Sequence, residues 1–98
     1  MGVDLEYAHS DTSLKVGEQP RTTIVGLIQL STSQTDYIID VYLLRELIRT
    51  DQNKNSLRSI FGDVNITKIM HGSSNDVKYL LADLGIATVN LFDTARSY

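Results

Sequence analysis

The sequence contains no cysteine and no tryptophan, and it has a single proline. Without cysteine there is no disulfide framework, no thiolate zinc site and no catalytic thiol. Every apolar run is far shorter than the roughly 20 residues that a membrane-spanning helix needs. The acidic residues Asp4 and Glu6 stand where a secretory signal would need a basic region followed by an apolar run. We therefore expect neither a membrane segment nor a signal peptide in this chain.

An excess of basic residues is also missing. Lys and Arg number 9 and Asp and Glu number 12, so the formal net charge is −3. Proteins that coat nucleic acids usually carry a clear basic excess that neutralises phosphates. Contact of this chain with a polyanion would therefore need a metal ion, or basic surface that the chain itself lacks.

What is present suits one small domain. The 98 residues are 42% hydrophobic and 21% charged, which excludes collagen-like, low-complexity and disordered chains. A chain of this length can bury a core, but with little stability to spare.

The first part of the chain has the pattern of a three-stranded meander. Residues 2–7 alternate between apolar and acidic side chains, which is the period of a half-buried strand. Residues 22–31 and 36–40 are rich in β-branched and apolar residues, and the short turn between them predicts an antiparallel hairpin. Residues 8–21 are polar and are expected to form a loop.

The period then changes to that of helices. Four apolar residues have the spacing of an inward-facing helix stripe, and the charged residues between them are expected on the outside. A second short helical piece, a buried strand over 68–71 and a turn follow. A helix is predicted over 75–84, with Gly85 as its stop, and a last strand over 88–92. The stripe comprises Leu43, Leu44, Leu47 and Ile48, and the charged residues are Arg45, Glu46 and Arg49.

The resulting order, β-β-β-α-β-α-β, is a meander followed by two crossover units. A mixed sheet flanked by helices satisfies this order, with right-handed crossovers between its parallel strands. The sequence therefore predicts an α/β fold.

Asp4 and Glu6 form the first candidate site. They are two residues apart on one strand, so their carboxylates share a face and stand roughly 6–7 Å apart at about 3.3 Å per residue. This spacing allows both to supply oxygens to one divalent cation, or to two cations about 4 Å apart. The alternative is an ordinary solvated strand face, which this common pattern also describes.

Asp76 is the second candidate. It stands in the first turn of a helix that leaves the carboxyl end of a strand, where open α/β sheets bind ligands. The alternative is a helix cap, since Ser73 and Asp76 have the spacing of a loose capping box. If the strand over 68–71 lies parallel to the first strand, Asp76 overhangs the edge to which Asp4 and Glu6 point. Three acids at one edge repel one another unless metal ions bind there.

Five short segments, spread over nearly the whole chain, occur in a characteristic order. They are Val-Asp-Leu-Glu at 3–6, Gly-Leu-Ile-Gln-Leu-Ser-Thr at 26–32, Tyr-Ile-Ile-Asp at 37–40, His-Gly-Ser-Ser-Asn-Asp-Val-Lys-Tyr-Leu at 71–80 and Asn-Leu-Phe-Asp-Thr at 90–94. Together they resemble the ribonuclease D family of 3′–5′ exonucleases, and within it most the branch of the nuclear exosome-associated exoribonuclease. The resemblance implies a ribonuclease H-like α/β mixed sheet, here truncated at the C-terminus.

The resemblance also implies an activity and its ligands. The family hydrolyses phosphodiester bonds from the 3′ end with two divalent metal ions, Mg²⁺ or Mn²⁺. Carried over by position, Asp4 would bridge both metals, Glu6 would bind the metal that activates water, and Asp76 would hold the second metal. The implied substrate is the single-stranded 3′ end of RNA, the implied partners are exosome subunits bound through the parent protein, and the implied compartment is the nucleus.

The family's fourth acid, and the Tyr four residues before it, are not found. They belong to a third motif downstream of the last predicted strand, and the chain ends at Tyr98. Tyr79 and Asp83 have the same spacing, but Asp83 lies two turns, about 10 Å, beyond Asp76 on one helix. Asp83 is therefore expected on the helix surface. Residues 1–98 are interpreted as a partial 3′–5′ exonuclease domain with the first two motifs, which alone would bind metal weakly or in part.

Three further residues are candidates for contact with the substrate. His9 stands in the predicted loop and is assigned to a nucleotide contact, with a solvated loop side chain as the alternative. His71 opens the second motif and is expected to pack or to hydrogen-bond beneath the site. Tyr79 is expected in core or substrate-side packing. Asp40 and Asp93 lie at strand ends and are expected to serve turns or caps rather than metal ions.

Two interpretations stay open at this point. In the first, the chain is the N-terminal part of an exonuclease domain whose parent is an enzyme, and the isolated chain is inactive. In the second, it is a stand-alone, non-catalytic relative that binds RNA or a protein partner. Its apolar residues suffice for a sheet covered on both faces, whereas its predicted helices are few. One face is therefore expected to keep an exposed apolar patch.

Overall fold

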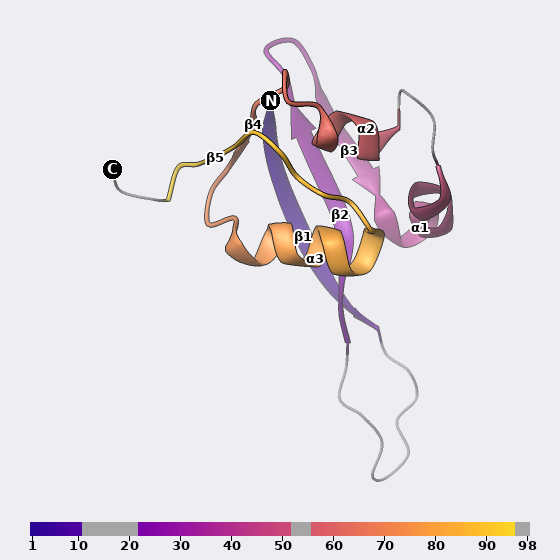
Figure 1. Cartoon of the computed structure of the whole chain (residues 1–98). Coiled ribbons are helices and arrows are strands. Elements are labelled where there is room, and N and C mark those ends of the chain that lie inside the picture. Colours follow the sequence, from indigo (N-terminus) through magenta and orange to yellow (C-terminus); the bar gives the residue numbers. More distant parts are fainter. Residues whose placement is uncertain (11–21, 52–55, 96–98) are drawn as a thin grey trace, which may run out of the picture.

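A computed structural model of the chain describes residues 1–10, 22–51 and 56–95 (Figure 1). Residues 8–10, expected in a loop, continue the first strand, and the rest of the predicted loop lies outside the described residues. None of the helices in the described ranges is long and apolar enough to cross a membrane. The elements in chain order are β1 (Gly2–Ser10), β2 (Thr22–Ser31), β3 (Asp36–Asp40), α1 (Val41–Thr50), α2 (Leu57–Gly62), β4 (Lys68–Met70), α3 (Ser74–Leu84) and β5 (Leu91–Asp93).

The strands form one mixed sheet in the order β3-β2-β1-β4-β5. β2 pairs antiparallel with both β1 and β3, whereas β4 pairs parallel with β1 and β5. The predicted hairpin, the mixed sheet and the helical stop at Gly85, where φ is +68°, are confirmed. The α/β fold class predicted from the sequence is therefore the fold that the chain adopts.

The last strand starts later than the sequence predicts. β5 begins at Leu91, whereas residues before it are held by isolated contacts. The Val89 N–H donates to the Phe61 carbonyl at 3.0 Å, and the Val89 carbonyl accepts from the buried Lys68 Nζ at 3.1 Å. Asn90 has a positive φ of 54°, which does not suit a strand. Asn90 is nevertheless joined to β4, because its carbonyl accepts from the Lys68 N–H at 2.9 Å.

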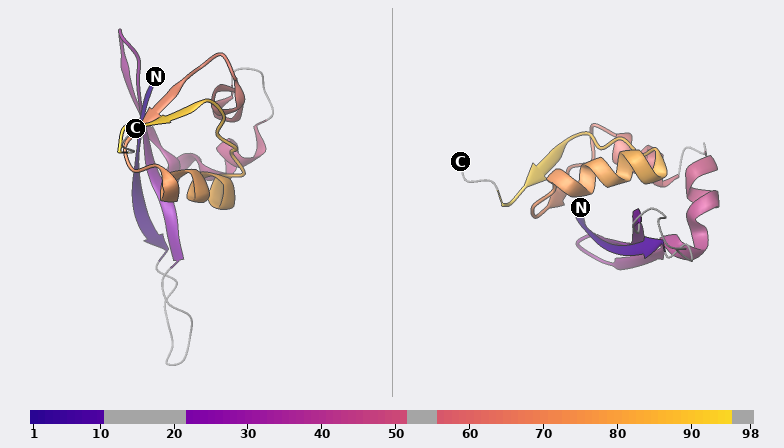
Figure 2. Two further views of the ribbon diagram at one scale, coloured as in Figure 1. Left: turned by 60° about the vertical axis from the view of Figure 1, so that its left-hand side comes forward. Right: turned by 90° about the horizontal axis from the view of Figure 1, so that it is seen from below.

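The helices gather on one side of β1, β2 and β3, as Figure 2 shows. We call this side the inner face: along β1, Val3 and Leu5 point into it and are buried. The alternate residues Asp4 and Glu6 are exposed and lie on the opposite, outer face. The cross-strand register puts Gln29 of β2 and Ile38 of β3 beside Asp4 on the outer face.

The outer face carries exposed apolar side chains. Ile38 is 69% exposed, and on the parallel side of the sheet Ile69 and Phe92 are 43% and 48% exposed. Ile69 is paired with Gly2 and Phe92 with Ile69, so they continue the outer face across the sheet. Exposed apolar side chains therefore lie on this face, and a continuous apolar patch stays a prediction.

A β-bulge opposite Glu6 and Tyr7 sets which side chains meet α3. The register passes from Glu6–Leu27 to Tyr7–Val25, leaving Gly26 as the extra residue. A Cβ atom at Gly26 would lie 3.2 Å from the Ala8 Cβ, so the close approach of the strands favours glycine there. The extra residue turns Val25 to the inner face, where it is fully buried.

The predicted inward stripe of α1 is wrong at its three leucines and right at Ile48. Leu43, Leu44 and Leu47 are 76%, 42% and 64% exposed. Ile48 is half-buried against the core, and the other covered positions are Val41 and Arg45. Arg45, expected outside, docks the helix because its guanidinium forms an ion pair with Asp83 of α3 and donates to the Val25 carbonyl at 2.7 Å. A polar contact has rotated α1 away from the face that its leucines suggest.

Asp83 is likewise not the surface residue expected from its helix position. One carboxylate oxygen accepts from Arg45, and the other accepts from the Val25 N–H at 2.8 Å. The Asp83 carboxylate thereby joins α3 to α1 and to β2, which are far from it in the sequence. Asp83 is a structural tie between these elements.

Candidate functional site

Asp76 lies against β1. It stands in the first turn of α3, and its Oδ1 accepts a hydrogen bond from the Tyr7 hydroxyl group. Tyr7 directly follows Glu6 and points to the inner face, where its ring meets that of Tyr79 edge-on at 5.1 Å between centroids. The strand–turn–helix path from β4 to α3 thus carries the second candidate acid to the strand that holds the first pair.

The charge of Asp76 is disfavoured by its surroundings. Burial raises the pKa of its carboxyl most, and the negative charges of Asp4 and Asp93 raise it further, against the hydrogen bond from Tyr7. The pKa of Tyr7 is raised above its usual range, first by burial and then by its hydrogen bond to Asp76. A carboxylate held near other acids in a half-buried place gains from a bound cation. Carboxylate oxygens such as those of Asp76 and Asp4 are ligands that suit Mg²⁺ or Mn²⁺.

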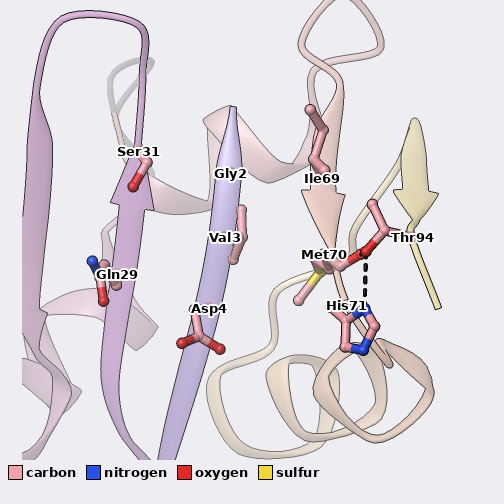
Figure 3. A pocket seen from close by; sticks show the side chains of 9 residues that line it. All are labelled: Gly2, Val3, Asp4, Gln29, Ser31, Ile69, Met70, His71 and Thr94. Carbon is pink, nitrogen blue, oxygen red and sulfur yellow. Dashed lines mark hydrogen bonds between the residues drawn. The ribbon is translucent and has the colours of Figure 1, made fainter.

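Asp4 lines a wide cavity of about 420 Å³ on the outer face. Figure 3 shows it between β2, β1 and β4, with polar groups from several elements around its rim. His71, just after β4, is exposed, and its Nδ1 lies 3.0 Å from the Thr94 Oγ1. The polar lining residues are Asp4, Gln29, Ser31, His71 and Thr94.

The three predicted acids are not gathered as a ready-made metal cluster. Among the residues that the structure describes, no group of three or more His, Asp or Glu side chains is placed to hold a metal ion. Alternation along β1 accounts for this, because Asp4 and Glu6 leave the strand on the outer face while Tyr7 turns to α3. The structure brings together Asp76 and Tyr7, with Asp4 close enough to raise the pKa of both.

The three predicted substrate residues lie in different places. His71 borders the cavity beside Asp4, and Tyr79 is half-buried against the core and against Tyr7. His9 lies in β1, paired with Thr23, and its side chain is outside the described residues. Sequence reasoning missed Tyr7, which it treated as one more apolar position of the first strand. The position of Tyr7 directly after the candidate ligand Glu6 was the sequence signal that could have identified it.

The two acids assigned to turns or caps do serve them. Asp40 caps α1, its Oδ1 accepting from the Leu43 N–H at 3.1 Å. Asp93 is buried at the end of β5 and accepts from the backbone of the turn between β4 and α3. The expected cap role of Asp40 and turn role of Asp93 are confirmed.

Comparison with known protein families gives the class of this protein. A family model described as 3′-5′ exonuclease matches residues 2–97, and the chain belongs to this family. The matching solved structures show that its fold is the ribonuclease H-like α/β fold.

The sequence relatives narrow the class to one branch. The chain is 38% identical over 94 residues to the exosome complex exonuclease RRP6 of Saccharomyces cerevisiae, covering 96% of this chain and 11% of that protein. It is similar in structure to the catalytic core of RRP6 from Trypanosoma brucei, with a TM-score of 0.70 and 31% identity, covering 95% of this chain and 22% of that one. These similarities place it in the branch of the family that contains RRP6.

A more distant structure shares the fold alone. The EXD2 exonuclease domain, soaked in Mg and GMP, matches with a TM-score of 0.65 at 22% identity, covering 94% of this chain and 41% of that one. The chain therefore spans a small part of the sequence relatives it matches and less than half of each of these solved chains.

Proposed function

We propose that residues 1–98 form part of a 3′–5′ exoribonuclease domain that shortens RNA from a single-stranded 3′ end. The observation that carries this is Asp76, a half-buried acid brought to β1, whose charge is disfavoured by burial and by Asp4. Membership of the 3′-5′ exonuclease family supports it. The acids would bind divalent metal ions, Mg²⁺ or Mn²⁺, with Asp4, Glu6 and Asp76 as ligands.

Each part of the site has a distinct task in this proposal. When bound, the metal ions supply a water of lowered pKa and stabilise the charge on the oxygens of the phosphodiester. Asp4, Glu6 and Asp76 hold the ions, and Tyr7 holds the Asp76 carboxylate in place against β1. The cavity beside Asp4, with His71 on its rim, is large enough to hold part of the terminal nucleotide. His9 and Tyr79 are assigned to flanking contacts with the RNA.

The partners follow the same proposal. The yeast relative is an exosome complex exonuclease, and we infer that the parent of this chain works with exosome subunits, in the nucleus. The chain itself carries a net charge of −3. Its affinity for RNA would therefore depend on bound metal and on basic surface supplied by partners.

The second candidate is a stand-alone, non-catalytic relative that binds RNA or a protein partner. It stays open beside the first, and the experiment below separates the two. On either reading we expect the isolated chain to bind metal weakly and to leave RNA intact.

Metal titration tests the proposal. Mn²⁺ is titrated into the chain by calorimetry and by paramagnetic broadening of amide signals, which reports where the ion lies. We expect broadening centred on Asp4 and Asp76, lost in Asp4→Asn and in Asp76→Asn. The control Asp36→Asn removes an exposed acid of β3 and should leave binding unchanged.

A labelled RNA with a free 3′ end is followed in the same samples. If Mn²⁺ binding is unchanged in Asp4→Asn and in Asp76→Asn, the proposed metal site is contradicted. Metal-dependent 3′ shortening by the isolated chain, abolished by Asp4→Asn, contradicts the expected inactivity and rules out the non-catalytic alternative.

A further inference from the structure

We propose that Asp93 is a positioning residue for Asp76: its carboxylate fixes the turn between β4 and α3 and so determines where the first turn of α3 meets β1. Asp93 does not touch the proposed ligands of the metal. The importance of this role for RNA cleavage rests on the proposed function, whereas the role itself concerns the structure.

The carboxylate of Asp93 accepts four hydrogen bonds, three of them from Gly72 and Ser73. Its Oδ1 accepts from the Gly72 N–H at 2.9 Å, and its Oδ2 accepts from the Ser73 N–H at 2.8 Å and the Ser73 hydroxyl at 2.7 Å. Oδ1 also accepts from the Ala95 N–H at 2.9 Å. Hydrogen bonds to a buried carboxylate are roughly twice as strong as those between neutral groups. Asp93 therefore restrains the turn more firmly than a neutral acceptor would.

The start of α3 depends on this contact because it has no cap of its own. Ser73 occupies the N-cap position with helical dihedral angles and makes no side-chain bond to the helix. Its hydroxyl donates to Asp93 instead. The Ser73 carbonyl then accepts from the Val77 N–H at 2.9 Å, the first bond of the helix. The N-cap residue of α3 is thus held by the end of β5, 20 residues downstream.

Thr94, the residue after Asp93, holds the start of the same turn at Met70. The Thr94 N–H donates to the Met70 carbonyl at 2.8 Å, and the Thr94 hydroxyl lies within hydrogen-bonding distance of both that carbonyl and His71. Gly72 has a φ of +68°, so the turn follows a path that most residues avoid. Held at Met70 and at Ser73, the turn between them has little freedom to shift.

The path from Asp93 to Asp76 is short. Asp76 lies three residues after Ser73, within the same first turn of α3, and reaches the Tyr7 hydroxyl on β1. If the carboxylate of Asp93 is removed, the N–H groups of Gly72 and Ser73 lose their partner and the first turn of α3 is free to move. The contact between Asp76 and Tyr7 should then be lost first.

The test compares three variants of the full 98-residue chain. Asp93→Asn keeps the shape but loses the charge and half of the acceptor capacity. Ser73→Ala removes one of the four hydrogen bonds. Asp40→Asn is the matched control, because it makes the same change at the cap of α1, where asparagine is also a good cap. The readouts are the NOE between the Tyr7 ring and the Asp76 β-protons, and the affinity for Mn²⁺.

In Asp93→Asn we expect the NOE to vanish while core signals persist, and the affinity for Mn²⁺ to fall about 10–100-fold, as for other residues that orient metal ligands. Ser73→Ala should show a smaller loss, and Asp40→Asn none. A folded Asp93→Asn chain with the wild-type NOE overturns the proposal. If Asp93→Asn fails to fold, Ser73→Ala decides, and wild-type values for both readouts overturn it.

The two readouts separate this proposal from the proposed function. Failure of the wild-type chain to bind Mn²⁺ at Asp76 contradicts the metal site, yet the NOE still reports whether Asp93 positions Asp76. If the wild-type chain binds Mn²⁺ and the NOE is unchanged in Asp93→Asn, the positioning role is contradicted and the metal site is not.

Discussion

The helices α1 and α3 are of similar length but differ in what they bury. α3 packs Leu80 and Leu84 into the core, with 0% and 1% of their surface exposed. α1 buries only Val41 completely and leaves Leu43 and Leu47 largely in solvent. The two helices have nearly the same kind of apolar spacing in the sequence, so spacing alone did not decide which leucines would be covered.

The contact between the two helices explains the difference. Arg45 of α1 pairs with Asp83 of α3, and both also bond to the backbone of Val25. Both side chains are mostly shielded, with 18% and 15% of their surface exposed. Because this network must stay satisfied once it is taken out of water, it sets the rotation of α1. The comparison shows that one shielded ion pair can outweigh an apolar stripe in orienting a helix.

The largest contrast is expected between matched leucines. Leu80→Ala should lower the free energy of unfolding by about 2–5 kcal/mol, because it opens a cavity in a closed core. Leu43→Ala should change it by less than about 0.5 kcal/mol, because Leu43 is 76% exposed. Urea unfolding followed by circular dichroism measures both. Equal losses would show that the stripe of α1 is covered in solution.

The ion pair between the helices gives the next largest effect. Asp83→Ala leaves the Val25 N–H without its acceptor and leaves the Arg45 guanidinium with the Val25 carbonyl but without its charged partner, and should cost about 1–3 kcal/mol. Glu46→Gln is the control, because its ion pair with Arg49 is exposed and 3.9 Å long, and should cost less than about 0.5 kcal/mol. The same urea titration compares them. A negligible loss in Asp83→Ala would mean that the leucines, not the ion pair, orient α1.

Acid should weaken the start of α3. Hydrogen bonds from the turn, that of the Ser73 N–H first, hold the pKa of Asp93 well below its usual range. Its ionised form therefore stabilises the fold above about pH 4, and this contribution is lost as the pH falls through the lowered pKa. Asp93→Asn should be less stable than wild type near neutral pH, with the difference shrinking below about pH 4. A difference that does not change with pH contradicts this prediction.

The exposed stripe of α1 should matter for association more than for stability. Replacing Leu43 and Leu47 by Gln should leave the free energy of unfolding within about 0.5 kcal/mol of wild type. We expect the wild-type chain to self-associate through exposed apolar side chains, and the double variant to do so less. Light scattering over a concentration series measures this. Unchanged association would point instead to the outer face, where Ile38→Gln is the next variant to compare.

Much of the fold could be predicted from local pattern. The alternation in β1, the β-branched runs of β2 and β3 and the stop at Gly85 each depend on neighbouring residues, and each was predicted. A turn or cap role was predicted for Asp40 and Asp93, because acids at strand ends commonly have such roles. Which turn Asp93 would hold was not predicted. The start of β5 was not, because contacts of Val89 with Phe61 and Lys68 lie far away in sequence.

The candidate site was only in part accessible in this way. Asp4, Glu6 and Asp76 were chosen from their spacing and from the resemblance, and their role as metal ligands stays a prediction. Tyr7 was missed as the partner of Asp76, because the two residues are 69 apart in sequence. The bulge at Gly26 that turns Val25 towards α3 is likewise a property of two strands together.

By itself the sequence determined the period of each element, the caps and stops at their ends, and the class of fold. These follow from steric preferences and from hydrogen bonds between residues a few positions apart. Only the tertiary structure decided which face of α1 is covered, which tyrosine meets Asp76 and which carboxylate holds the start of α3. These contacts join residues 20 to 69 positions apart. Those of Arg45, Asp83 and Asp93 form because a polar group removed from water must find its partner wherever the folded chain places one.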